Sequence, residues 1–319
     1  MPCFDRPLEE LKTYTGSSPR PADFDEYWRR GMAEMESVYA PPELVRSDFP
    51  AKYSDCYDMY FTGVGGAKVH AKVIIPKDLK EPAPCVCFYH GYYGRVEDWT
   101  HFLHWPAQGY VFAGLDCRGQ AGLSEDVGGV KGNTIVGQII RGLEDPNPDA
   151  LLFRSIFLDC AQMAKYMFDM DIVDKTKVYT DGGSQGGALS LATAALEPRI
   201  AKTAAEFPFL CDYKRVWDMD LTTEPYSELR RFFRWRDPVH GRSEEFFNKL
   251  GYIDIQNHAP NIKAKVLMFT GLMDQICPAS SQFAAYNKMT CEKKMIIYPD
   301  FGHEGLPGCG DYTFRFFAE

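Results

Sequence analysis

A serine set between closely spaced glycines is the residue of this chain best suited to covalent chemistry. Residues 182–187 read Gly-Gly-Ser-Gln-Gly-Gly, so Ser184 has glycine two positions to either side. A stretch rich in Val, Tyr and Thr precedes them, and an Ala- and Leu-rich helical pattern follows from Ala188 to Leu196. A strand, a sharp turn and a helix in that order hold a serine in a strained backbone conformation with its hydroxyl clear of the sheet. The pattern predicts that Ser184 is a nucleophile; the alternative is a tight glycine turn that happens to contain serine.

An acid and a histidine that could activate this serine follow it in the sequence. Residues 265–270 read as a buried strand, and Asp274 comes shortly after its end. A second short strand, at 294–298, is followed by His303. A serine hydroxyl is a weak nucleophile at neutral pH, so an imidazole must accept its proton and a carboxylate must hold that imidazole in the useful tautomer. The order Ser184, Asp274, His303 is that of an α/β-hydrolase catalytic triad.

Asp300 competes with Asp274 for the acid position, because it lies nearer to His303 in the sequence. It falls in the same loop as the histidine, where an aspartate commonly shapes a turn. Asp274 follows its own strand, from which a carboxylate can reach across to the imidazole, and we therefore favour Asp274. Glu304 is expected to fix the histidine loop and not to transfer protons.

Two backbone amides are candidates for an oxyanion hole. The α/β-hydrolase arrangement uses the amide after the nucleophile, here that of Gln185, and an amide from the loop after an earlier strand. The expected strand at 86–90 ends in Gly-Tyr-Tyr-Gly-Arg at 91–95. Glycines on both sides of the tyrosines let that loop fold back, so the amide of Tyr92 is predicted to be the second donor. The alternative is an ordinary turn with two surface tyrosines. His90 is expected to shape this loop and not to act as the base.

Strands and helices alternate along most of the chain, which predicts a mostly parallel sheet with helices on both faces. The expected strands cover residues 86–90, 109–116, 178–181, 201–206, 265–270 and 294–298, and the expected helices cover 21–37, 99–108, 147–170 and 188–196. Before them, residues 52–75 alternate as an antiparallel hairpin that turns at residues 63–66.

Two segments interrupt this alternation. Residues 118–145 are glycine-rich and too long for an ordinary connection, so we expect them to cover something. Residues 207–260 carry helical pieces between two core strands, and we expect a helical insertion over the site. The aromatic residues of this insertion could line a pocket or pack against one another. Because no linker is evident, we expect a single α/β domain over residues 1–319, with a helical extension at 1–40.

Composition limits the partners of this chain. The formal net charge of −9 argues against nucleic acid, since a phosphate backbone calls for a basic surface. No apolar run is long enough to cross a bilayer, and the amino terminus lacks a basic start followed by an apolar core. We therefore expect a cytoplasmic protein without a membrane partner, whose ten cysteines are reduced. No His-Glu-x-x-His arrangement is present, and neither a metal nor an organic cofactor is expected.

Several short motifs together resemble one family of carbohydrate esterases, the acetyl xylan esterase/cephalosporin-C deacetylase family. They are Arg-Gly-Gln at 118–120, Gly-Gly-Ser-Gln-Gly at 182–186 and His-Glu at 303–304, with His-Gly-Tyr at 90–92 upstream. The resemblance spans nearly the whole chain. One departure is Ala121, where the family commonly has a further glycine. Arg118 is expected to anchor loops around the site, with direct substrate contact as the alternative.

This resemblance implies an α/β-hydrolase fold and the removal of acetyl groups from acetylated xylo-oligosaccharides and from cephalosporin C. It implies the triad Ser184, Asp274 and His303, with the amides of Tyr92 and Gln185 as the oxyanion hole. It also implies a homo-hexamer whose active sites face an internal cavity that admits small substrates. A broader carboxylesterase or a peptidase with the same triad, and a non-catalytic hydrolase-like binding protein, are the alternatives.

Overall fold

One mixed β-sheet forms the centre of the protein, in a computed structural model that describes residues 4–127, 137–221 and 223–319. The strands run in the order β1-β2-β3-β5-β4-β6-β7-β8-β9. The first three pairs in this order, β1 with β2, β2 with β3 and β3 with β5, are antiparallel. The remaining pairs, from β5 with β4 to β8 with β9, are parallel. The strands are β1 Glu43–Arg46, β2 Ser54–Thr62, β3 Lys68–Pro76, β4 Ala83–Tyr89, β5 Val111–Leu115, β6 Val173–Gly183, β7 Lys202–Glu206, β8 Lys265–Gly271 and β9 Lys293–Tyr298.

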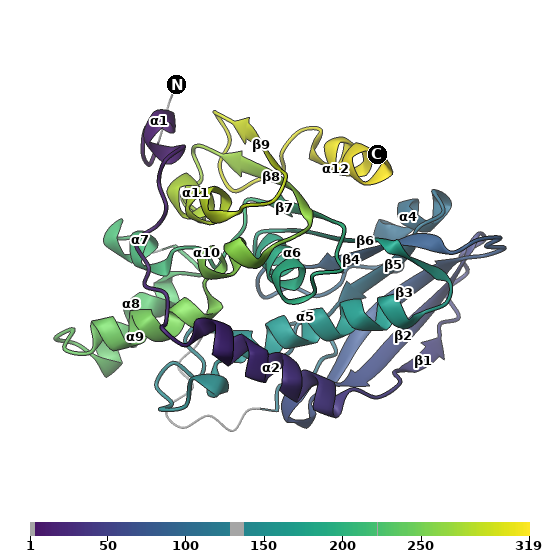
Figure 1. The fold of residues 1–319 in the computed structure, drawn as a ribbon, viewed down its shortest axis with the longest axis horizontal. Coiled ribbons are helices and arrows are strands. Elements are labelled where there is room, and N and C mark those ends of the chain that lie inside the picture. Colours follow the sequence, from purple (N-terminus) through teal and green to yellow (C-terminus); the bar gives the residue numbers. More distant parts are fainter. Residues whose placement is uncertain (1–3, 128–136, 222) are drawn as a thin grey trace.

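Helices of very different length precede, connect and follow these strands (Figure 1). The α-helices are α1 Leu8–Leu11, α2 Phe24–Val38, α3 Trp99–Phe102, α4 His104–Ala107, α5 Leu152–Asp169, α6 Gln185–Leu196, α7 Tyr213–Asp218, α8 Ser227–Arg236, α9 Ser243–Leu250, α10 Ile255–His258, α11 Ala279–Lys288 and α12 Cys309–Ala318. Short 3-10 turns are η1 Val64–Gly66, η2 Pro148–Ala150, η3 Gly251–Ile253 and η4 Ala259–Asn261.

Both faces of the sheet are covered, as the sequence predicts. Successive side chains of a strand point to opposite faces. In β4, Cys85 and Cys87 belong to the larger apolar core, which α2, α5 and α6 also supply. Val86 belongs to a second core, together with Trp105 of α4 and Phe317 of α12. Figure 1 shows α2, α5 and α6 lying across one face of the sheet.

The predicted hairpin is present, but two predicted helices have different limits. Strands β2 and β3 pair from Ser54–Pro76 to Thr62–Lys68 around the η1 turn. The helix expected at 99–108 is wrong as one element, because it is divided into α3 and α4. Proline has no amide hydrogen, and a second helix that starts at His104 places Pro106 in its first turn, where that hydrogen is not needed. The helix expected at 147–170 begins only at Leu152, after the η2 turn.

The segment between β7 and β8 is helical, as expected, and contains α7 to α10. Its aromatic residues pack against one another. The rings of Phe232 and Phe246 lie 4.8 Å apart, and those of Trp217 and Phe233 lie 4.6 Å apart. Trp235 is an exception, with 74% of its surface exposed. Of the two interpretations for these aromatic residues, local packing describes most of them.

The glycine-rich segment expected to cover something is only partly described. Residues 128–136 lie outside the described residues. On either side of that gap, Asp126 pairs with Arg141 across the segment. Gln138 and Ile139 contact the candidate site described below. Through those contacts, residues 138 and 139 of the segment lie against Tyr92 and Glu228.

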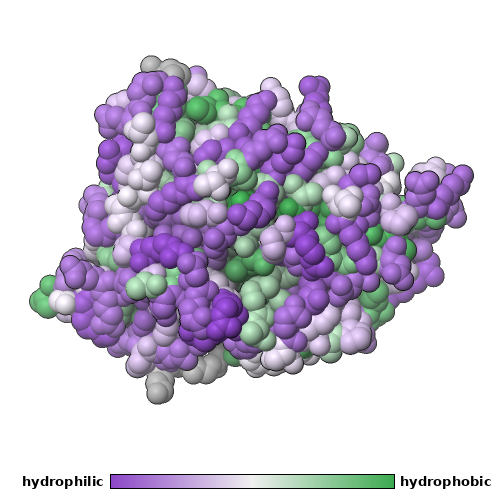
Figure 2. All heavy atoms as spheres, in the orientation of Figure 1, coloured by the Kyte–Doolittle hydropathy of each residue, from purple (hydrophilic) through white to green (hydrophobic). Residues whose placement is uncertain are grey.

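The surface in the view of Figure 2 is mostly hydrophilic, with small apolar areas between charged side chains. Among the helices of the described residues, none is both long enough and apolar enough to span a membrane. The cysteines in the same residues are free thiols, and all but Cys291 are buried. Those residues also contain no group of three or more His, Cys, Asp or Glu side chains arranged to hold a metal ion.

The carboxyl group of Asp181, near the end of β6, has a pKa above its usual value. Burial of Asp181, and then the negative charge of Glu206 on β7, raise the pKa of Asp181 from 3.8 to about 7. Because the folded state binds this proton more tightly than the unfolded state, the stability that the proton confers is present at acid pH. That contribution is lost as the pH rises from about 4 to about 7.

Asp181→Asn therefore removes a charge that the folded protein tolerates poorly above pH 7. We expect the substitution to raise Tm at pH 8 by on the order of 3 °C and to change it little at pH 5. Thermal unfolding at both pH values measures this. Asp171→Asn, at an exposed turn beside the start of the same strand, is the matched control. The same change in Tm at both pH values would contradict the assignment.

Candidate active site

Ser184 occupies a strained turn between β6 and α6. Its backbone angles are φ 56° and ψ −115°, which residues other than glycine rarely adopt. A Cβ at residue 182 would lie 2.6 Å from the carbonyl oxygen of Tyr89, and one at residue 186 would lie 1.9 Å from the same atom. Glycine is needed at both positions because the start of α6 presses against the end of β4. The predicted strand, turn and helix are all present.

The structure brings together the three side chains that the sequence nominates. Nε2 of His303 lies 3.0 Å from Oγ of Ser184, and Nδ1 of His303 lies 2.8 Å from Oδ2 of Asp274. The other carboxylate oxygen of Asp274 accepts hydrogen bonds from the amides of Ile276 and Cys277, each at 2.8 Å. Asp274 is fully buried. These bonds fix its orientation before any substrate arrives.

Parallel strands explain how residues so far apart in sequence meet. Residues at the carboxyl ends of parallel strands lie at one edge of the sheet. Ser184 follows β6, Asp274 follows β8 and His303 follows β9. A Cβ at Gly271 would lie 2.3 Å from the carbonyl oxygen of Phe301, so the end of β8 touches the histidine loop directly.

Asp274, and not Asp300, contacts the imidazole. Asp300 lies exposed in the turn after β9, as its sequence position suggested. Glu304 accepts a hydrogen bond of 3.0 Å from the amide of Gly302. That contact holds the loop of His303, the role the sequence predicts for Glu304.

The two predicted amide donors lie on neighbouring segments. Gln185 is the first residue of α6, and amides in the first turn of a helix have no acceptor within that helix. Tyr92 lies in a turn in which the amide of Gly94 donates to the carbonyl oxygen of Gly91 at 3.1 Å. The φ of Tyr93 is 59°, which places this residue in the left-handed region.

The side chain of Gln185 joins these segments to the Arg-Gly-Gln motif. Gln120 donates to Oε1 of Gln185 at 2.8 Å, and Gln185 donates back to Oε1 of Gln120 at 3.2 Å. The second hydrogen of Nε2 of Gln185 is shared between the carbonyl oxygens of His90 and Gly91, which lie 3.3 and 3.4 Å from this nitrogen. The side chain of Gln185 is completely buried. The loops after β4 and β5 are thereby tied to the nucleophile turn.

Arg118 anchors loops, the first of the two roles considered for it. Its guanidinium donates two hydrogen bonds of 2.6 Å to the carboxylate of Asp159 in α5. A third bond, of 3.1 Å, goes to the carbonyl oxygen of Val64 in η1. With only 3% of its surface exposed, Arg118 forms part of the support beneath the site.

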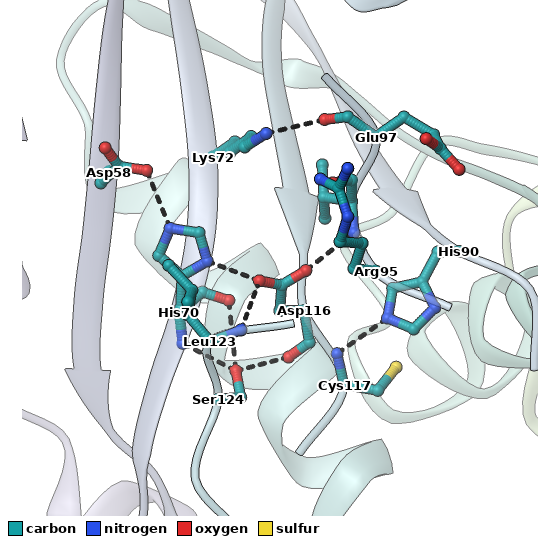
Figure 3. Close-up of polar contacts among 11 residues, drawn as sticks. Asp58, His70, Lys72, His90, Arg95, Glu97, Asp116, Cys117, Leu123 and Ser124 are labelled. Carbon is teal, nitrogen blue, oxygen red and sulfur yellow. Dashed lines mark hydrogen bonds and ion pairs between the residues drawn. The ribbon is translucent and has the colours of Figure 1, made fainter. Parts of the chain in front are cut away.

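Asp116 was not anticipated from the sequence, and it holds three elements together (Figure 3). Oδ1 accepts from the amide of Val96 at 2.7 Å, and Oδ2 accepts from the amide of Leu123 at 2.9 Å and from Nδ1 of His70 at 2.7 Å. Burial alone would raise the pKa of Asp116, but the hydrogen bonds from His70 and the two amides outweigh it and lower the pKa. The loops after β4 and β5 are thus fixed to β3.

Glu228 of α8 was also missed, and it contacts the candidate oxyanion loop. Its Oε1 accepts hydrogen bonds from the hydroxyls of Tyr92 and of Tyr93, the latter at 2.8 Å. Its Oε2 accepts from the amide of Ile139 at 2.9 Å. Burial raises the pKa of Glu228 despite these bonds. A single glutamate in an amphipathic helix carries no sequence signal for such a role.

Comparison with known proteins shows which family this chain is similar to. The family described as "Acetyl xylan esterase (AXE1)" matches residues 1–319. Acetyl xylan esterase 1 from Thermoanaerobacterium sp. JW/SL YS485 is similar with a TM-score of 0.96 and 51% identity, over 98% of each chain. An acetyl xylan esterase from Paenibacillus sp. R4 is similar with a TM-score of 0.92 and 33% identity, over 98% of this chain and 99% of that one.

A curated relative, the acetyl esterase Axe7A of Xylanibacter ruminicola, is 25% identical over 303 residues. The match takes in 91% of this chain but spans only 64% of that relative's length. The family match and the two solved structures extend over essentially the whole of this chain. The chain therefore belongs to the acetyl xylan esterase family, and its fold is that of an α/β-hydrolase.

Proposed function

We propose that the protein is a serine esterase that removes acetyl groups from small acetylated carbohydrates through an acyl-serine intermediate. The observation that carries this proposal is the continuous hydrogen-bonded chain from Ser184 through His303 to Asp274. Membership of the acetyl xylan esterase family supports the substrate class. Acetylated xylo-oligosaccharides and cephalosporin C are the proposed substrates.

In the proposed mechanism, Oγ of Ser184 attacks the acetyl carbonyl carbon while Nε2 of His303 accepts the hydroxyl proton. Negative charge develops on the carbonyl oxygen, and the amides of Tyr92 and Gln185 donate hydrogen bonds to it. Asp274 stabilises the imidazolium that forms. When the carbon–oxygen bond to the sugar breaks, His303 gives its proton to the departing sugar oxygen.

The second half of the reaction repeats these roles with water. His303 accepts a proton from a water molecule as that water attacks the acetyl group on Ser184. The same two amides hold the second oxyanion. Collapse of this intermediate returns the proton to Oγ of Ser184 and releases acetate.

Ser184→Ala removes the attacking oxygen while the turn and its neighbours stay in place. We expect kcat for an acetyl ester to fall at least about 10⁴-fold, because a triad loses nearly all of its effect with its nucleophile. Hydrolysis of 4-nitrophenyl acetate measures the loss, and circular dichroism checks the fold. Ser37→Ala, at an exposed position of α2, is the control. Undiminished turnover in the Ser184 variant would defeat the proposal.

Comparison of substrates in the same assay tests the acyl group and the leaving group. Acetylated xylose and cephalosporin C are expected to be cleaved faster than butyryl or octanoyl esters. Peptide amides are expected to be inert. A faster rate on long acyl esters would favour a broader carboxylesterase, and cleavage of peptide amides would favour a peptidase.

Glu228→Gln tests whether the helical insertion supports the oxyanion loop. Glutamine keeps the size of the side chain, but one carboxylate acceptor becomes an amide donor that faces a phenol or the amide of Ile139. An unsatisfied buried group costs about 1–3 kcal/mol, so we expect kcat to fall on the order of tenfold or more as the loop shifts. Steady-state kinetics measure it.

Glu244→Gln, at an exposed position of α9 in the same insertion, is the matched control and should keep wild-type kinetics. A wild-type kcat in the Glu228 variant would show that the contact has no bearing on the reaction.

We also propose that the protein is cytoplasmic and forms a homo-hexamer. The cysteines at described positions are free thiols, most of them buried, which supports a reducing compartment. The family resemblance supports the hexamer. Light scattering after size-exclusion chromatography should give a particle six times the 36.2 kDa of the chain. A monomeric or dimeric mass at micromolar concentration would contradict the hexamer.

A further inference from the structure

His90 lies at the end of β4 with both ring nitrogens engaged. The backbone amide of Cys117 donates to Nε2 of His90 at 3.0 Å, as Figure 3 shows. An amide can only donate, so Nε2 must be the acceptor and carry no proton. A neutral imidazole then carries its proton on Nδ1. That nitrogen lies 2.7 Å from the carbonyl oxygen of Gly91, to which it donates.

The carbonyl group that His90 holds belongs to the same peptide unit as the amide of Tyr92. A trans peptide is planar, and its C=O and N–H point in opposite directions. Fixing the carbonyl of Gly91 therefore fixes the direction of the Tyr92 N–H.

Two further donors act on the same carbonyl oxygen of Gly91. They are the amide of Gly94 at 3.1 Å and Nε2 of Gln185 at 3.4 Å. A Cβ at residue 94 would lie 3.0 Å from this oxygen and 3.2 Å from Nδ1 of His90, so the turn closes tightly over the imidazole. Since Gln185 directly follows Ser184, the peptide of Gly91 and Tyr92 is tied to the nucleophile turn. Rotating this peptide would break all three bonds.

The surroundings of His90 keep it neutral. It is 4% exposed, and burial lowers its pKa, although the bond to the Gly91 carbonyl and the charges of Asp116 and Glu97 oppose the shift. The thiol of Cys117 stays protonated, because burial raises its pKa. A proton on Nε2 would set two donors against each other at the 3.0 Å contact with the Cys117 amide.

We infer that His90, as the neutral tautomer protonated on Nδ1, is a positioning residue that fixes the Gly91–Tyr92 peptide and so aims the Tyr92 amide at the developing oxyanion. This inference rests on the proposed function. It adds the residue that orients the Tyr92 amide, one of the two proposed oxyanion donors. His90 transfers no proton to substrate. Its contribution is orientation, which matters most when charge has developed in the transition state.

Two substitutions separate the hydrogen bond that His90 donates to Gly91 from the one that it accepts from Cys117. His90→Asn places an amide near the position of Nδ1, where it can still donate to Gly91. His90→Gln places its amide near Nε2, where it can accept from Cys117 but cannot hold Gly91. We expect His90→Gln to lower kcat up to about 10²-fold with KM within about twofold. His90→Asn should retain at least about a tenth of wild-type kcat, because it keeps the donor.

Inhibition by a trifluoromethyl ketone that adds to Ser184 distinguishes orientation of the oxyanion donor from a merely structural role of His90. The adduct of this ketone carries an oxyanion, so its inhibition constant should rise in His90→Gln by the same factor as kcat falls. His101→Asn, at an exposed position of α3, is the control and should change neither. If His90→Gln keeps wild-type kcat and inhibition, or if Asn and Gln lose activity equally, the inference is overturned.

Imidazole ¹⁵N NMR of the histidine-labelled wild-type protein reads the tautomer directly, and a variant is needed only to assign the His90 resonance, so it must fold but need not be active. The resonance absent from His90→Asn should report a neutral ring with its proton on Nδ1 at pH 7. A charged ring, or a proton on Nε2, would overturn the inference. Failure of the proposed function has a different signature, namely wild-type protein without esterase activity or with activity that survives Ser184→Ala.

Discussion

The two hydrogen bonds of the His303 imidazole set the geometry that the remainder of the structure has to maintain. One bond reaches Ser184 after β6 and the other reaches Asp274 after β8, while the histidine itself follows β9. A shift of about 1 Å in any of these strand ends would lengthen a bond and can cost on the order of 10²-fold in rate. The parallel half of the sheet limits such shifts, because its backbone hydrogen bonds fix the relative height of the strands.

Buried polar groups form a second layer of support beneath the loops. Asp116, Arg118, Gln185 and Glu228 are all nearly inaccessible to solvent, and each has hydrogen-bond partners from other elements. A buried polar group is costly unless it is satisfied, so each of these groups favours one arrangement of its loops over the alternatives. The loops after β4 and β5 and helix α8 are thereby held in register with Ser184. We propose that this layer prepares the two candidate oxyanion donors before substrate binds.

Local pattern was enough to predict the parts of the site that follow from the path of the backbone. The glycines around Ser184 predicted the strained turn. The order of the strands predicted that Asp274 and His303 lie at the same edge of the sheet as Ser184. The choice of Asp274 over Asp300 agrees with the observed contact, because strand topology outweighs distance along the chain. Alternating strands and helices also predicted the covered sheet. The error at 99–108 arose where Pro106 favours a new helix start over continuation.

The contacts missed from the sequence are pairings between distant polar residues. Glu228 and Tyr92 are 136 positions apart, and His70 and Asp116 are 46 apart. Neither pairing leaves a periodic or local mark in the sequence. They depend on how the insertion and the antiparallel strands pack, which is set by the whole core. Even the bond between neighbours His90 and Gly91 is informative only once the amide of Cys117 has fixed the tautomer.

Mass spectrometry after reaction with a serine-directed phosphonate tests the central claim most directly. An activated hydroxyl reacts with such a reagent, whereas ordinary serines do not. The account predicts one adduct per chain, located by peptide mapping on Ser184, and a much slower reaction when His303 is replaced by alanine. An adduct on another residue, or an equally fast reaction without the imidazole, would contradict it.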